Sequence, residues 1–110
     1  MPYEYNISDI RVIDGDTVEA TIHLGFNIDM RRKIRLLDLD TWEVRGPNKE
    51  LGLKAKEYLK SLLENKEVIL LSERDKKGKY GRILGTLLTD TEDYLLNINC
   101  LMREHWSKEK

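Results

Sequence analysis

Acidic side chains gather at two places where strand-like sequence stops. One group flanks Gly15 in the segment VIDGDTVEATI, and the other lies in LLDLDTWEV. These acids are Asp14, Asp16, Asp38, Asp40 and Glu43. Carboxylates that lie close together repel each other unless a cation neutralises them, and a hard divalent cation such as Ca²⁺ takes carboxylate, carbonyl and water oxygens. Asp16, Asp40 and a nearby backbone carbonyl therefore make a reasonable but incomplete metal site.

Two arginines accompany the acids. Arg35 precedes the second acidic group in the same segment, and Arg82 lies in the segment KYGR. A guanidinium fork suits a phosphate, and Glu43 is then left to act on a water. This combination describes metal-assisted hydrolysis of a phosphodiester bond. Each motif also has a plain interpretation, because DGD is a common turn, DLDTWE suits a solvated loop, and exposed arginines are frequent.

The elements that must position these residues follow from periodicity. Val18, Ala20 and Ile22 alternate with polar residues, which is the pattern of a half-buried strand. Apolar residues then recur at helical spacing, with Asn48 as N-cap and Asn65 as the stop. The predicted strands are 5–14, 16–24, 30–39, 66–72 and 80–88, and the predicted helices are 49–64 and about 97–105.

This order, β-β-β-α-β-β-α, predicts a mainly β fold with helices (α+β). It matches a five-stranded Greek-key barrel of the OB type. The length of 110 residues predicts a single domain over residues 1–110. Asp14 ends the first predicted strand and Asp16 begins the second, so both are expected at the rim of the barrel. A small barrel can bring the second acidic group and both arginines to the same mouth.

Bulk properties exclude several classes of function. The net charge is −1, so binding of a polyanion would depend on local clusters such as RRKIR at residues 31–35. The single cysteine, Cys100, excludes an internal disulfide and a cysteine-based zinc site. No apolar run is long enough for a membrane span, and no secretory pattern is visible at the N-terminus. We therefore expect a cytoplasmic protein.

Three segments together resemble the staphylococcal nuclease (thermonuclease) family. They are VIDGDTV, IRLLDLDTWE and KYGR, in the family's order and near its spacing, and the resemblance extends from about Ile10 to Leu101. It implies an OB-fold barrel and a Ca²⁺-dependent nuclease that cuts DNA and RNA and leaves 3′-phosphate ends. We expect a monomer that prefers single-stranded substrates.

The resemblance also implies roles for individual residues. Asp16 and Asp40 would be metal ligands together with the backbone carbonyl of Thr41, and Asp14 would be a supporting acid. In catalysis, Arg35 would bind the scissile phosphate, Glu43 would be the general base or orient the water, and Arg82 would stabilise the transition state. Lys79 and Tyr80 would contact a neighbouring phosphate.

The sequence departs from the family pattern at several positions. Trp42 stands where proline is frequent, so Glu43 lacks a stiff neighbour. Asp38 adds negative charge near the site. The family's C-terminal tyrosines have no counterpart, and Trp106 is expected to pack against the barrel. Two other functions stay open: a non-catalytic nucleic-acid or protein-binding module, and an acidic rim that binds a cation for stability alone. The retained acids and arginines favour the nuclease.

Overall fold

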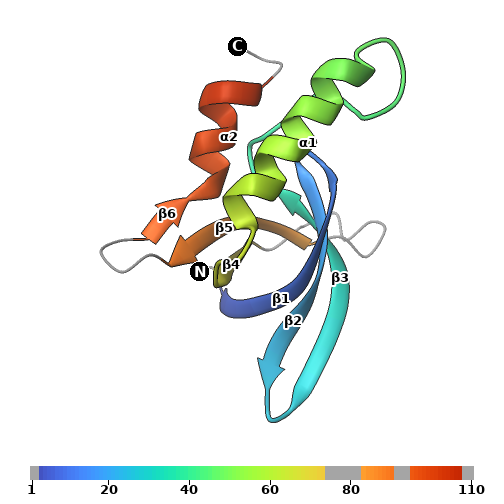
Figure 1. Cartoon of the computed structure of the whole chain (residues 1–110). Helices are drawn as coiled ribbons and strands as arrows, with labels where there is room; N and C mark the ends of the chain where they lie inside the picture. Colours follow the sequence, from blue (N-terminus) through green and yellow to red (C-terminus); the bar gives the residue numbers. More distant parts are fainter. Residues whose placement is uncertain (1–2, 74–82, 91–94, 108–110) are drawn as a thin grey trace.

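The chain starts with three antiparallel strands, and a long helix then leads into the second half of the fold (Figure 1). The computed structural model describes residues 3–73, 83–90 and 95–107. Its elements are β1 (Tyr3–Asp14), β2 (Thr17–Gly25), β3 (Ile28–Leu36), α1 (Lys49–Leu63), β4 (Val68–Glu73), β5 (Ile83–Asp90), β6 (Leu95–Asn97) and α2 (Ile98–Trp106).

The strands close into a barrel. Their order in the sheet is β3-β2-β1-β4-β5-β6, and β3 also pairs with β5. In that parallel pairing Ile34 lies opposite Ile83 and Leu36 opposite Gly85. The first five strands therefore form a closed barrel with two helices, and the predicted OB-type fold and element order are confirmed. The short strand β6 was not predicted, because three residues carry no recognisable alternation.

The core follows the alternation of the strands. Val18, Ala20 and Ile22 of β2 are buried, and Ile34 and Leu36 of β3 face the same interior. Strand β1 pairs with both β2 and β4. Its pairing with β2 shifts register twice, between Ser8 and Arg11 and between Val12 and Asp14. Such bulges bend a strand and increase its twist. The bent β1 therefore brings its C-terminal end, and the acids that follow, to one mouth of the barrel.

Helix α1 begins and ends close to the predicted positions. Asn48 occupies the N-cap position, but its side chain makes no capping hydrogen bond; the carbonyl of Gly46 accepts from Lys49 N at 3.3 Å instead. The helix ends at Leu63, and Asn65 then adopts a left-handed φ of 59°. In the part of the chain that the structure describes, neither helix is long and apolar enough to cross a membrane.

Helix α2 is fastened to the barrel by one buried amide. The side chain of Asn97 caps the helix by accepting from Cys100 N at 3.0 Å. Asn99, 1% exposed, donates to the carbonyls of Leu37 and Gly85 and accepts from Leu87 N, each at 3.1 Å. These bonds join α2 to β5 and to the segment after β3, so α2 indirectly positions the segment that carries the second acidic group.

The last turn of α2 packs as predicted. Trp106 lies against the hydrophobic core, and its ring centroid is 6.1 Å from that of Tyr58 on α1. The two helices therefore share an aromatic contact on the outside of the barrel.

Candidate active site at the barrel mouth

The turn between β1 and β2 is packed tightly against its neighbours. A Cβ atom added to Gly15 would lie 2.7 Å from Ala55 Cβ on α1 and 2.8 Å from Thr41 Oγ1. Gly15 does not adopt a positive φ. Glycine is therefore needed here because it has no side chain, and not because the turn is left-handed. Because Gly15 has no side chain, the turn at residues 15–16 can approach both α1 and the segment around Thr41 that carries the second acidic group.

Asp16 is a buried carboxylate with a full set of partners. Its side chain is 6% exposed. Oδ1 accepts from Thr17 Oγ1 at 2.9 Å, and Oδ2 accepts from Thr41 N at 3.1 Å. Its backbone carbonyl accepts from Leu36 N at 2.8 Å, which ties the turn to the end of β3. A buried charge requires such hydrogen bonds, because desolvation would otherwise favour the neutral acid.

Arg35 links the two acidic groups. Its Nη2 lies 3.3 Å from Asp16 Oδ2 and 3.5 Å from Asp40 Oδ1, and it donates to the carbonyl of Leu39 at 3.1 Å. Both carboxylates therefore face one nitrogen of Arg35, whose positive charge lies between them. The fold brings together four of the predicted residues: Asp16, Arg35, Asp40 and Thr41.

Asp38 stands at the edge of this group. Together with Arg35, Asp40 and three leucines it lines a cavity of about 450 Å³. Its side chain is 77% exposed, its φ is 56°, and its Oδ2 lies 4.0 Å from Arg103 Nη1. The predicted extra negative charge is thus present at the cavity, where Arg103 of α2 partly offsets it.

Glu43 and Asp14 lie beside a different, smaller cavity. This cavity has a volume of about 260 Å³ and is lined also by Ile13, Val44 and Arg45. Asp14 Oδ1 accepts from Val44 N at 3.3 Å, so its carboxylate holds the acidic segment in place. The Glu43 carbonyl packs on Gly52 of α1, where any side chain would overlap it. The predicted base is therefore exposed and fixed through its backbone, but it does not line the cavity of Arg35.

The remaining predicted residues, Lys79, Tyr80 and Arg82, lie outside the described residues. Within the described ranges, no group of three or more histidine, cysteine, aspartate or glutamate side chains could hold a metal ion. The predicted ligand set has fewer than three such side chains, because it consists of the carboxylates of Asp16 and Asp40 and the backbone carbonyl of Thr41.

Sequence reasoning missed the residues that position the site. Gly52 makes room for the Glu43 backbone, and Asn99 holds the carbonyl of Leu37. The single signal for Gly52 was a glycine inside a helical pattern, which often marks close packing. Nothing local in the sequence marked Asn99.

A comparison with known proteins decides the family. The family model described as staphylococcal nuclease homologue matches residues 33–104. The chain belongs to this family. The resemblance noted in the sequence is thereby confirmed, and the match indicates a nuclease-like, nucleic-acid-binding domain. The matched stretch contains Arg35, Asp40 and Glu43, whereas Asp14 and Asp16 precede it.

A curated relative is also similar to the chain. It is the uncharacterized protein MJ1439 of Methanocaldococcus jannaschii, 33% identical over 111 aligned positions. The alignment covers 82% of this chain and 51% of the relative. The chain therefore spans about half the length of this relative.

Proposed function

We propose that the chain is a Ca²⁺-dependent nuclease that hydrolyses phosphodiester bonds in DNA and RNA, prefers single strands and leaves 3′-phosphate ends. One observation carries the proposal: the carboxylates of Asp16 and Asp40 face the same nitrogen of Arg35, at 3.3 and 3.5 Å. Two acids and an arginine at one point are what a site for a cation and a phosphate requires.

The donor set fits a hard cation. Asp16, Asp40 and the backbone carbonyl of Thr41 would hold it, and all three supply oxygen, which Ca²⁺ prefers. When bound, such a cation supplies positive charge beside a phosphate and polarises a water. Asp16 is well suited to the role, because Thr17 and Thr41 N fix the orientation of its carboxylate.

The side chains of this domain would then divide the remaining tasks. Arg35, which in the structure lies between both acids, would turn its forked donors to the scissile phosphate. Glu43, whose side chain is exposed, would orient the attacking water and accept its proton. Arg82 would stabilise the charge that develops at phosphorus, and Lys79 and Tyr80 would hold a neighbouring phosphate.

A second function is favoured by a different observation. Glu43 lines a cavity with Asp14, whereas Arg35 and Asp40 line another. A domain that keeps these residues apart would bind nucleic acid or a protein without cleaving it. The two functions differ in one measurable property, which is turnover.

The test is digestion of end-labelled single-stranded DNA by the wild-type chain with Ca²⁺, by the wild-type chain with a chelator, and by Glu43→Gln with Ca²⁺. We expect cleavage only by the wild-type chain with Ca²⁺, a steep loss in Glu43→Gln, and products whose 3′ ends a polymerase extends only after phosphatase treatment. The matched control is Glu57→Gln, which neutralises an exposed glutamate on α1 and should cut like the wild-type chain.

The outcome separates the two functions. Folded protein that binds the DNA but leaves it intact in the presence of Ca²⁺ acts as the binding module. Equal cleavage by Glu43→Gln and Glu57→Gln would remove Glu43 from the mechanism.

A further inference from the structure

The turn between β2 and β3 carries a cluster of exposed apolar side chains. Phe26 is 97% exposed, Ile28 56% and Leu24 38%. Figure 1 shows the two strands extending well past the rest of the barrel to this turn. An apolar cluster at a projecting tip is a common sign of an interaction surface. We call the segment from Leu24 to Ile28 the hairpin tip.

The backbone of the hairpin tip is unfavourable for its residues. Phe26 and Asn27 have φ values of 54° and 61°. A two-residue hairpin turn with positive φ at both central positions is of type I′ and prefers Asn-Gly. A bulky side chain at positive φ is a genuine outlier, and at 97% exposure Phe26 gains almost no packing against the described residues to offset it. Such outliers concentrate at functional positions.

Side-chain contacts across three strands fix the direction of the hairpin. His23 of β2 lies 2.7 Å from Ser8 Oγ through Nε2 and 2.8 Å from Asp29 Oδ1 through Nδ1. The order of contacts resembles the relay of serine hydrolases. However, His23 and Asp29 are 41% and 55% exposed, so water competes for each group and the network serves to hold strands together.

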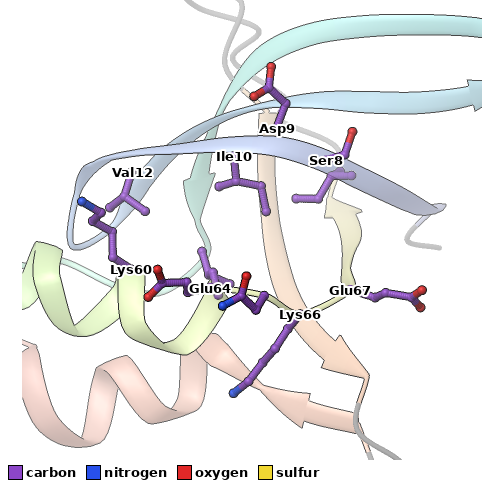
Figure 2. A pocket seen from close by; sticks show the side chains of 11 residues that line it. Ser8, Asp9, Ile10, Val12, Lys60, Glu64, Lys66 and Glu67 are labelled. Carbon is purple, nitrogen blue, oxygen red and sulfur yellow. The ribbon is translucent and has the colours of Figure 1, made fainter.

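The bulge of β1 adds a second attachment. Arg31 of β3 donates from Nη1 to the Asp9 carbonyl at 2.9 Å, and its Nε lies 3.3 Å from Glu19 Oε1. Figure 2 shows Asp9 and Ile10 on opposite sides of β1, with Ile10 pointing into a groove beside α1 of about 460 Å³. The bulge thus turns Asp9 outward toward β3. The projecting hairpin is therefore held in its direction by side-chain contacts to β1.

The hairpin is continuous with the candidate active site. Strand β3 ends at Leu36, directly after Arg35, and it begins at Ile28 of the hairpin tip, seven residues before Arg35, which is about 23 Å along the strand. Lys33 shares the face of Arg35 because strand side chains alternate, and it is exposed. Arg31, on the same face, is already engaged by Glu19 and Asp9. The exposed Lys33 therefore lies along β3 between the site and the hairpin tip.

We propose that the hairpin is a nucleic-acid arm on which a single strand leaving Arg35 runs along β3, with Lys33 at a phosphate and Phe26 stacked on a base. This inference rests on the proposed function for the position of the scissile phosphate. Stacking on an aromatic ring tolerates any base, and the charge of Lys33 suits the phosphate backbone. The reach of about 23 Å along β3 also agrees with the roughly 4–16 nucleotides that single OB folds cover.

The test replaces the turn by its preferred sequence, Phe26→Asn with Asn27→Gly. Binding is measured by fluorescence anisotropy with Ca²⁺ in a Glu43→Gln background, so that the oligonucleotides stay intact. We expect binding of a strand of about 12 nucleotides to weaken about five- to tenfold, and binding of a strand of about 4 nucleotides to stay unchanged. The urea midpoint of unfolding should stay equal or rise, because the new turn relieves the backbone.

The control is Leu95→Asn, which removes another exposed apolar side chain, 54% exposed, on β6. It should change neither binding nor the length dependence. Equal affinities of the turn variant and its Glu43→Gln parent for the longer strand would overturn the proposal. So would a parallel loss for both lengths.

Sedimentation velocity then measures whether the chain self-associates through the tip. Self-association of the wild-type chain that disappears in the turn variant would assign the tip to contacts between two copies and overturn the nucleic-acid arm. Because the anisotropy experiment needs no turnover, absence of cleavage by the wild-type chain would remove the proposed nuclease function and leave the length-dependent binding result intact.

Discussion

Arg35 and Asp16 form an ion pair at the mouth of the barrel, with 3.3 Å between Nη2 and Oδ2. Asp16 lies in the turn after β1 and Arg35 near the end of β3, and the antiparallel pairing of Thr17 with Arg35 brings them together. The same nitrogen also reaches Asp40. Substitution of Arg35 therefore best separates the effect of its positive charge from the effect of its forked hydrogen-bond donors.

Arg35→Lys should keep the positive charge but lose the forked donors. If Arg35 meets the phosphate, we expect kcat on single-stranded DNA to fall by about 10²–10³-fold, the typical loss for one such donor. Stability should fall by less than the roughly 3–5 kcal/mol that removing one partner of a buried pair costs, because lysine keeps a positive charge beside Asp16, whose side chain is 6% exposed. Steady-state kinetics and urea unfolding of the same preparation measure both quantities. A variant that unfolds readily and retains full kcat would contradict this role.

Gly15→Ala should destabilise the fold by about 1–3 kcal/mol, as overpacking typically does. The new methyl would lie 2.7 Å from Ala55 Cβ. Combining it with Ala55→Gly should recover part of the loss, beyond the roughly 1 kcal/mol that glycine costs inside a helix. A double-mutant cycle from urea unfolding measures the coupling. Strictly additive effects would mean that the turn moves away from α1 at little cost.

Asn99→Ala should be among the most damaging single changes outside the hydrophobic core. It removes three hydrogen bonds and leaves the Leu37 carbonyl and Leu87 N without this partner, whereas the Gly85 carbonyl keeps its bond from Leu37 N at 2.8 Å. Each unsatisfied group costs about 1–3 kcal/mol, so the total should be at least about 2 kcal/mol. Asn97→Ala is the comparison, because it removes one helix cap, worth about 1 kcal/mol. Thermal unfolding should rank the two variants in this order, and the reverse order would refute the proposed anchoring of α2.

Thr89→Val should stabilise the protein by up to about 1 kcal/mol. Thr89 in β5 is fully buried, and within the described part of the chain its Oγ1 has no hydrogen-bond partner. Valine has nearly the same shape, prefers strands and carries no hydroxyl that must be desolvated. Thr86→Val, on the less buried face of β5, should have a smaller effect. A lower denaturant midpoint for Thr89→Val would indicate that the hydroxyl has a partner in solution.

The sequence by itself determined the local features of this protein. Alternation around Ala20 and helical spacing from Lys49 specified β2 and α1, because the side-chain period of each element is a property of its own backbone. The acids at the strand ends could also be recognised from the sequence, because they interrupt the apolar pattern of the strands. The chemistry of the candidate site, an oxygen-donor pair with an arginine, therefore follows from residue types and their spacing alone.

Tertiary structure alone decided how these parts meet. Closure of β3 against β5, and the bond from Thr41 N to Asp16 Oδ2 across 25 residues, depend on contacts that no local pattern records. The same holds for Asp14, which bonds Val44 N and lines a cavity with Glu43. A carboxylate takes whichever donor the surrounding backbone presents. The sequence therefore specified which groups could act, and long-range packing specified which of them face one another.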